Sequence, residues 1–223
     1  MMISLKKYFY NGILLGAFTL LGCSDEDAGN KEATAESLNT EQLISSENDV
    51  NTSKVEKKLS VNDTEIAYEM CVSLLTDYYK AVWNGSNIEL NTFIKNENLK
   101  HYLQKKIQEQ SHLYSAFNDK VQNVEIGAWE TEFVDDTDGG YLYLKIPADI
   151  KKSIGGFGEV NEFLVRSLNG SLVIVDWYNG SKDSYDFLVR GENITIDDPN
   201  IWNDSEWVKV INNKQNDFSG TTR

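Results

Sequence analysis

The chain of 223 residues has few of the residue types that build metal sites, nucleophilic catalytic sets and disulfides. It contains only two histidines, His101 and His112, and only two cysteines, Cys23 and Cys71. Positive charge is also scarce, because 21 Lys and Arg stand against 35 Asp and Glu, a formal net charge of −14. Such an acidic chain repels the phosphates of nucleic acids, so we expect no nucleic-acid partner.

The two histidines are too far apart to share a metal ion. Both fall in a segment with helical periodicity, residues 97–117, where a rise of about 1.5 Å per residue separates them by roughly 16 Å. They also lie opposite the apolar positions Leu99 and Leu103, which indicates exposure to solvent. A Ser or Cys nucleophile would need one of them in a cleft, and no Gly-x-Ser-x-Gly elbow occurs in the chain. We therefore expect no metal, no cofactor and no nucleophilic catalysis.

Two segments match ligand-binding motifs only superficially. Residues 155–158 are rich in glycine, but they lack the Lys-Ser/Thr of a phosphate-binding loop and the spacing of a dinucleotide fingerprint. Asp135, Asp136 and Asp138 precede Gly139, but the bidentate Glu and the alternating ligands of a calcium loop are missing. We interpret the first segment as a flexible loop and the second as a solvated hairpin turn.

The N-terminus lacks a stretch long enough to span a membrane, yet it has the layout of an export signal. Lys6 and Lys7 precede an apolar segment, residues 8–21, in which Asn11 is the one strongly polar interruption. A spanning helix needs about 20 apolar residues, so a permanent anchor helix is not expected. A basic stretch followed by a short apolar one is typical of a signal peptide.

The apolar segment ends in Leu20-Leu21-Gly22-Cys23, which resembles the lipobox of bacterial lipoproteins. The resemblance implies that residues 1–22 are removed as a signal peptide and that Cys23 receives a diacylglyceryl group. The new N-terminus can be acylated as well, and two or three chains anchor a protein stably. The partner is then the cell membrane, reached through the lipid on Cys23 from the extracytoplasmic face. The alternative is an ordinary secretory signal whose cysteine later pairs or becomes buried.

The mature chain is expected to begin with a disordered acidic tether. Removal of residues 1–22 takes away two lysines and no acids, which brings the formal charge to −16. Residues 23–62 contain no aromatic residue and show no sustained periodicity, as in disordered segments. Their excess of acids should keep the tether extended and the domain away from an anionic membrane surface. With Cys23 acylated, Cys71 has no partner for an internal disulfide.

Helical periodicity begins at Thr64. One arc of a helix with 100° per residue collects Ala67, Met70, Cys71, Leu74, Leu75, Tyr78, Tyr79 and Val82. We expect this helix to end near Gly85, and Cys71 to be a core residue rather than a reactive thiol. Ser86 and Glu89 have capping-box spacing and predict a short second helix. A third helix is expected from about Glu97 to Phe117.

After Asp119 the periodicity becomes that of strands. We expect four of them, over residues 121–134, 141–146, 159–168 and 171–178. Asn169-Gly170 predicts a type I′ hairpin turn between the last two. Helices followed by an antiparallel meander predict an α+β fold with the helices on one face of the sheet. Residues 185–189 are expected as a further strand, Asp198-Pro199 as the start of a helix, and residues 212–223 as a frayed tail.

The order and lengths of these elements, closing with Val175-Asp176-Trp177-Tyr178, resemble the NTF2-like (cystatin-like, SnoaL-like) superfamily. They are similar, more narrowly, to the domain that precedes amidase domains in some exported bacterial proteins. The resemblance implies a domain over residues 63–211, with N-terminal helices packed on a curved antiparallel sheet to form a cone, followed by a C-terminal extension. Too few residues remain after Tyr178 for an amidase domain, so we expect no hydrolytic activity.

Asp176 is the best single candidate for a functional residue. A two-residue turn places on one face the pairs Ser167 with Leu172, Val165 with Ile174, and Phe163 with Asp176. This face is the drier one and should meet the helices, so that a cone is lined by Tyr78, Tyr79, Trp83, Phe163 and Asp176. A carboxylate there suits proton transfer or a polar ligand contact. The alternative is a structural Asp bonded to backbone amides or a Tyr hydroxyl.

Three functional hypotheses remain open. The first is a non-catalytic module that binds a small apolar ligand, a peptide or an envelope protein with the open side of the sheet. The second is an NTF2-like enzyme in which a buried carboxylate transfers a proton on a small substrate. The third is a lipoprotein that regulates or scaffolds a neighbour through exposed Trp202 and Trp207. A buried carboxylate discriminates the first two.

Overall fold

The computed structural model describes residues 59–221. The predicted signal peptide, Cys23 and residues 24–58 of the predicted tether lie outside this range. Among the described residues, no helix is long and apolar enough to cross a membrane.

The N-terminal helices occur where the periodicity places them. Helix α1 (Val61–Asn84) begins at Ser60, which forms a capping box with Asp63. It ends at Gly85, whose left-handed conformation, with φ at 69°, lets its N–H reach the carbonyls of the last turn. Helix α2 (Glu97–Ser115) starts at Asn96, whose side chain accepts the N–H groups of residues 98 and 99.

The predicted second helix is only a 3₁₀ turn, η1 (Leu90–Thr92). The capping box predicted from Ser86 and Glu89 is wrong, because Glu89 precedes η1 without a side-chain cap. Ser86 instead donates its N–H to the carbonyl of Lys80 and so completes the end of α1. A residue engaged in ending one helix is not placed to start the next.

Five antiparallel strands form one sheet, in the order β1–β3–β4–β5 with β2 also beside β3. Their bounds are Val121–Ile126, Glu130–Val134, Tyr141–Lys152, Gly156–Leu168 and Ser171–Asn179 for β1 to β5. The predicted strand 121–134 is therefore two strands, interrupted where Gly127 donates its N–H to the carbonyl of Pro147. Residues 156–158, predicted as a loop, pair with β3. The α+β class is confirmed.

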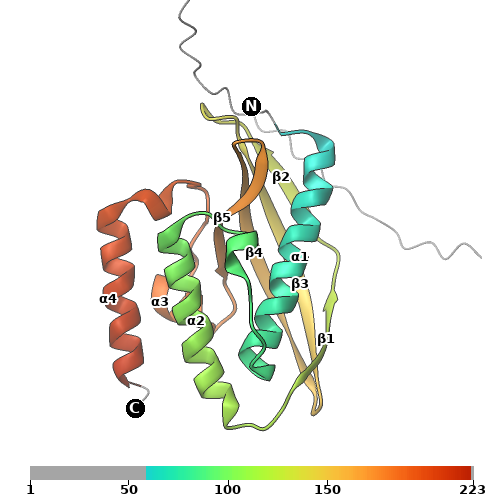
Figure 1. Cartoon of the computed structure of the whole chain (residues 1–223), viewed down its shortest axis with the longest axis vertical. Helices are drawn as coiled ribbons and strands as arrows, with labels where there is room; N and C mark the ends of the chain where they lie inside the picture. Colours follow the sequence, from blue (N-terminus) through green and yellow to red (C-terminus); the bar gives the residue numbers. More distant parts are fainter. Residues whose placement is uncertain (1–58, 222–223) are drawn as a thin grey trace, which may run out of the picture. The chain divides into compact units, whose positions relative to one another are not determined.

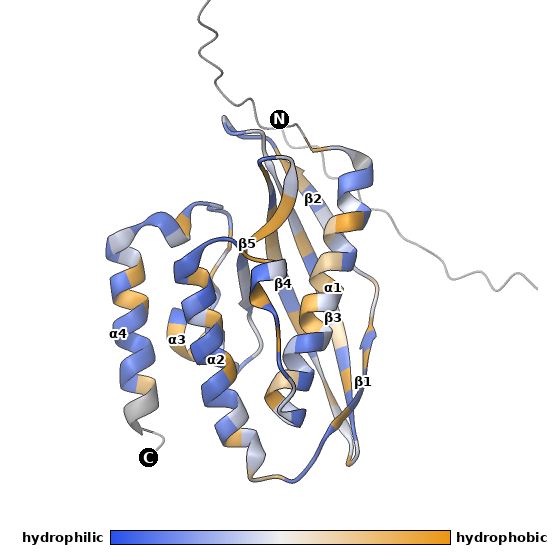
Figure 2. Ribbon diagram, viewed as in Figure 1, coloured by the Kyte–Doolittle hydropathy of each residue, from blue (hydrophilic) through white to orange (hydrophobic). Residues whose placement is uncertain are grey.

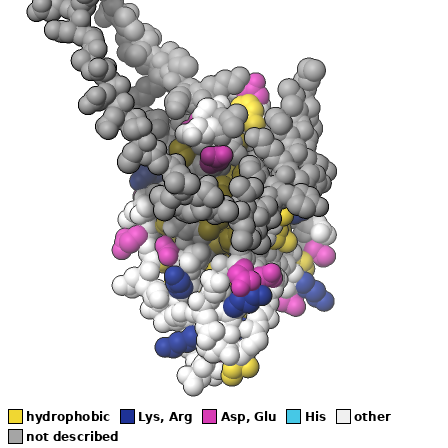
Figure 3. Space-filling model, turned by 90° about the vertical axis from the view of Figure 1, so that its right-hand side faces the viewer, with side chains coloured by type: hydrophobic (Ala, Val, Ile, Leu, Met, Phe, Trp, Pro, Cys, Tyr) yellow, Lys and Arg dark blue, Asp and Glu magenta, His cyan; other side chains and the backbone are white. Residues whose placement is uncertain are grey.

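Helix α1 covers one face of the sheet (Figure 1). Its hydrophobic arc, visible in Figure 2, includes the fully buried Cys71, Leu74 and Leu75, so the core position predicted for Cys71 is confirmed. The sheet contributes Leu144 and Phe163 to the same core. On the face shown in Figure 3, the described residues carry basic and acidic side chains interspersed, so neither sign of charge is gathered there.

A β-bulge in β5 makes the predicted register wrong from Val175 onward. The pairs Ser167 with Leu172 and Val165 with Ile174 occur as predicted, but Leu164 then faces Asp176 and Phe163 faces Trp177. One extra residue in a strand moves the following side chains to the opposite face. Trp177 therefore takes the place in the main core that was predicted for Asp176, and it stacks on Phe163 with ring centres 5.4 Å apart.

The C-terminal segment differs from the prediction in four respects. The helix predicted to start at Asp198-Pro199 begins only at Ser205, after a 3₁₀ turn. The predicted strand 185–189 is a helix, α3 (Tyr185–Arg190), because the Ser184 hydroxyl caps its first turn. Trp202, in the 3₁₀ turn η2 (Ile201–Asn203), is buried rather than exposed. Helix α4 (Ser205–Thr221) continues through most of the predicted frayed tail, because Ile211 and Gln215 are buried on its inner side. Figure 1 shows α2, α3 and α4 side by side.

Candidate functional site

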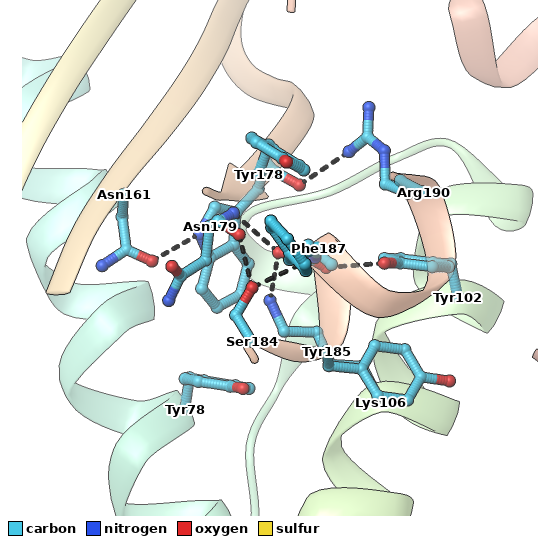
Figure 4. A network of polar contacts seen from close by, with 12 residues as sticks. Tyr78, Tyr102, Lys106, Asn161, Tyr178, Asn179, Ser184, Tyr185, Phe187 and Arg190 are labelled. Atoms are coloured by element: carbon cyan, nitrogen blue, oxygen red, sulfur yellow. Dashed lines mark hydrogen bonds and ion pairs between the residues drawn. The ribbon is translucent and has the colours of Figure 1, made fainter. Parts of the chain in front are cut away.

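Five buried or largely buried charged side chains form an interior network: Lys106, Glu159, Asp176, Asp186 and Arg190. They come from α2, β4, β5 and α3, elements far apart in the sequence. Figure 4 shows part of this network, with Lys106 and Tyr102 from α2 and Arg190 from α3 converging beside the end of β5. Each charge is surrounded by groups that hydrogen-bond to it or oppose it, and these contacts decide what the network can do.

Arg190 and Asp176 form a two-point ion pair. Nη1 lies 2.9 Å from Oδ1 and Nη2 lies 2.8 Å from Oδ2. The indole N–H of Trp202 and the backbone N–H of Trp177 each donate to the same carboxylate at 2.8 Å. The guanidinium carbon lies 5.3 to 5.6 Å from the ring centres of Tyr178, Trp207 and Trp202. Burial, the largest single influence, lowers the pKa of Arg190, but the charge and hydrogen bonds of Asp176, together with Tyr102 and Asp186, raise it by more.

Asp186 is the second carboxylate of the interior network and is fully buried. It accepts hydrogen bonds from the Tyr102 hydroxyl at 2.6 Å, the Lys106 ammonium at 2.8 Å and the backbone N–H of Asn179 at 2.7 Å. Lys106 also lies 4.0 Å from the ring centre of Trp177, a cation–π contact. Burial, and then the Asp186 charge, raise the pKa of Tyr102 well above its ordinary value. Asp186 is therefore fixed by one cation and two neutral donors.

Glu159 differs from the two aspartates because no cation contacts it directly. Its Oε2 accepts the Tyr79 hydroxyl at 2.6 Å and the Asn179 amide at 2.5 Å. Desolvation raises the pKa of Glu159, against the hydrogen bonds and the more distant charge of Lys106, which lower it. Glu159 also lines a shallow hollow of about 240 Å³ together with Pro147. Its carboxyl group therefore binds a proton more tightly than an ordinary glutamate does.

The structure brings together only some of the predicted site residues. Tyr78 and Tyr79 are buried with ring centres 5.1 Å apart, and Phe163 lies in the same core through its stacking on Trp177. Trp83 is half-buried near the end of α1. Asp176 does not join them, because its carboxylate is held by Arg190 and Trp202.

Sequence reasoning missed most of the interior network, although one pattern in it was recognisable. Lys106 follows Leu99 and Leu103 at helical spacing and so falls on the buried arc of α2, which indicates a buried cation in need of a carboxylate. Asp186 and Arg190 stand four residues apart, a helical spacing that the strand prediction concealed. Glu159 stood at the start of an expected strand beside the glycine-rich segment, where no burial was expected.

A larger hollow, here called the Arg166 groove, lies elsewhere on the molecule and measures about 840 Å³. It is formed by the β2–β3 turn, the β4–β5 hairpin, the start of α2 and the segment around η2. Its lining residues are Lys95, Asn96, Asp135, Thr137, Asp138, Gly139, Arg166, Leu168, Val173, Ile174, Val175, Pro199, Asn200 and Asn203.

Arg166 is the most buried charged residue of this lining, with 7% of its surface exposed. Nη2 contacts Oδ2 of Asp136, while Nη1 lies 3.4 Å from the Asn200 amide oxygen and 3.9 Å from Asp138. Its Nε is buried and has no hydrogen-bond partner among the described residues. An unused donor of a buried guanidinium is unfavourable unless an acceptor reaches it.

The Asp-rich turn of the groove is a hairpin turn, as predicted. Oδ1 of Asp136 accepts the backbone N–H groups of Asp138 and Gly140, each at 2.8 Å, and so closes the turn. Within residues 59–221, no cluster of three or more His, Cys, Asp or Glu is arranged to hold a metal ion. The two histidines are exposed, as the prediction from their helical spacing requires.

No family model matches the chain, and neither the curated proteins nor the solved structures gave a match. The resemblances to the lipobox and to the NTF2-like superfamily therefore stay predictions.

Proposed function

We propose that this protein is a lipoprotein anchored through Cys23 on the extracytoplasmic face of the cell membrane. Its globular part, an NTF2-like domain with helices on a curved sheet, serves as a non-catalytic binding or accessory module for a small ligand, a peptide or an envelope protein. The Leu20 to Cys23 pattern supports the anchor, and the α+β fold supports the domain.

One observation carries the binding role. The charged aspartates of the interior network, Asp176 and Asp186, are held in place by Arg190 and Lys106. A carboxylate whose oxygens already accept hydrogen bonds from fixed protein donors has a structural role, and it has no acceptor left for a substrate. The Arg166 groove, in contrast, is open, and Arg166 in its lining has a buried Nε without a hydrogen-bond partner among the described residues. The geometry therefore favours binding at the groove over chemistry in the interior.

The anchor is tested by growing cells with a tagged fatty acid. Wild-type protein should carry the label and sediment with membranes, while Cys23→Ala should lose the label and be released. Cys71→Ala is the matched control, since Cys71 is buried and should leave labelling unchanged. Retention of Cys23→Ala on membranes in high salt would remove this part of the proposal.

The binding role is tested by placing a photo-crosslinking amino acid at Leu168, which lines the groove and is 38% exposed. The matched control is Val210 on α4, which is 51% exposed. In cells, a discrete adduct should form from position 168 and not from position 210. Equal adducts at both positions, or none at position 168, would count against a groove-binding module.

A second candidate function has a specific observation in its favour. Glu159 has a raised pKa, a hydroxyl and an amide to orient it, and a hollow beside it, as a proton-transferring carboxylate of an NTF2-like enzyme would have. Under this alternative, Glu159→Gln is as inactive in a cellular assay as deletion of the gene. Under the leading proposal, Glu159→Gln stays functional and Arg166→Gln does not.

A further inference from the structure

We propose that the Arg166 groove binds the free C-terminal carboxylate of a short peptide, with Arg166 as the group that receives it. This inference deepens the binding role proposed above and names its ligand class. It rests on the contacts of one guanidinium, on the charges around it and on the remaining lining of the groove.

The guanidinium of Arg166 is incompletely used. Asp136 contacts Nη2, and the contacts of Nη1 to Asn200 and Asp138 are long, at 3.4 and 3.9 Å. Nε, which is buried, has no acceptor among the described residues. A carboxylate bound in the plane of a guanidinium takes two donors at once, which is why arginine is favoured for carboxylate recognition. A ligand carboxylate that spans Nε and Nη2 would complete this geometry.

Asp136 is the group that the ligand must displace, because its carboxylate already occupies Nη2 of Arg166. The adjacent Nε is buried in the free protein. The Asp136 side chain is 25% exposed, and only its Oδ2 contacts Arg166. Its Oδ1 separately holds the turn through the N–H groups of Asp138 and Gly140. The Arg166 guanidinium can therefore leave Oδ2 of Asp136 while Oδ1 still holds the turn. The Asp136 carboxylate thus makes a contact with Arg166 that the ligand carboxylate would make in its place.

The charges of the groove select a ligand with a single carboxylate. Lys95 and Arg166 provide two positive charges, while Asp135, Asp138 and Asp136 provide three negative ones. A phosphate group or a dicarboxylate would bring two negative charges to a groove that already has a surplus of acids. One carboxylate that takes the place of Asp136 on Arg166 adds the least negative charge, and a basic group elsewhere on the ligand would meet the exposed aspartates.

The rest of the lining fits a peptide better than an aliphatic acid. Leu168, Val173 and Val175 offer an apolar wall for a side chain. Asn200 and Asn203 place amide groups along the same groove, while the Asn96 side chain bonds to Asn203 and to the start of α2. Side-chain amides hydrogen-bond to the N–H and C=O groups of a peptide. An alkyl chain offers no hydrogen-bonding group, so the amides beside it would stay unpaired. These features point to a peptide end rather than to a fatty acid.

The chain offers an internal control for the experiment. It contains three arginines, Arg166, Arg190 and Arg223, so an arginine-labelled sample gives three Nε–H signals in an NMR correlation spectrum. Arg190, like Arg166, has a buried Nε without a partner in the described residues, but it belongs to the interior network. The probes are a mixture of N-acetylated tripeptides with free carboxylates, the same mixture amidated at the C-terminus, and acetate.

We expect the peptide acids to shift the Nε signal of Arg166 and to leave that of Arg190 in place, while the amides shift neither. Asp136→Asn should bind the peptide acids about tenfold more tightly, since it keeps Oδ1 and removes the competing charge. A variant that is merely destabilised would not bind more tightly. Arg166→Gln should abolish binding.

Three results would overturn the inference. Equal shifts with acids and amides would mean that the carboxylate is not recognised. Acetate as effective as the peptides would assign the site to small carboxylates instead. An unchanged Arg166 signal would exclude this ligand class, and the crosslinking at Leu168 would then still report separately on whether the groove binds anything.

Discussion

Arg190 and Arg166 are both buried and both paired with an aspartate, but their surroundings differ. Arg190 makes two short contacts to Asp176, which is 1% exposed, and three aromatic rings surround the pair. Arg166 contacts Asp136, which is 25% exposed, at the wall of an open groove. In the first pair both charges are neutralised by buried partners. In the second, the partner is partly exposed, and we propose that a ligand replaces it. The same two residue types thus give a structural element in one place and a candidate binding element in the other.

The largest expected effect is on the closed pair. Asp176→Asn leaves the Arg190 charge buried without a counter-charge, and breaking one side of a buried pair reduces stability by about 3–5 kcal/mol. Urea denaturation should show this loss. Asp149→Asn is the matched control, because Asp149 is exposed on β3 and its change should stay within about 0.5 kcal/mol. Unchanged stability of Asp176→Asn would mean that Asp176 is not held for structural reasons.

The open pair should respond much less. Asp136→Asn preserves the turn through Oδ1 and removes a partly exposed contact, so we expect a loss of about 1 kcal/mol or less. The same denaturation series measures it, with an unchanged m-value. A loss as large as that of Asp176→Asn would erase the distinction between the two pairs.

The smallest expected effect is that of Glu159→Gln, which should raise the free energy of unfolding at neutral pH, whereas the two aspartate substitutions lower it. The pKa of Glu159 is raised in the folded state above the ordinary 4.5, so the folded protein binds a proton more tightly than the unfolded chain does. Stability should therefore fall as the pH rises from about 4.5 through the raised pKa, and then level off. Glu159→Gln should be slightly more stable than wild type at neutral pH and should lack this slope. A wild-type curve without such a slope, or a less stable variant, would contradict the assignment.

The sequence predicts α1 and α2 well because each has local determinants. The apolar arc of α1 and its Gly85 end were visible in the sequence, and so was the Asn169-Gly170 turn. The register beyond Ile174 was not, because nothing in Ser171 to Tyr178 marks the bulge at Val175. A single extra residue reverses the faces of all later residues in the strand. The bulged register is favoured because it places Trp177, rather than Asp176, in the main hydrophobic core. This preference depends on tertiary packing and not on the local sequence.

The candidate site was less accessible to prediction than the fold. α3 alternates Tyr185, Phe187 and Val189 like a strand, and only the Ser184 cap and the spacing of Asp186 and Arg190 indicate a helix. The Arg166 groove joins residues from Lys95 to Asn203 that approach only in the folded chain. Periodicity indicates the face of a helix or strand on which a residue lies. It carries no information about contacts between residues that are far apart in the sequence.

The central claim is that ligand is bound at the Arg166 groove and not in the interior network. The most direct test is the affinity for the N-acetylated peptide acids of two variants, Arg166→Gln and Glu159→Gln, both first shown by denaturation to be folded. We expect Arg166→Gln to lose binding and Glu159→Gln to keep the wild-type affinity. Binding that survives in Arg166→Gln and disappears in Glu159→Gln would contradict it and place the site in the interior.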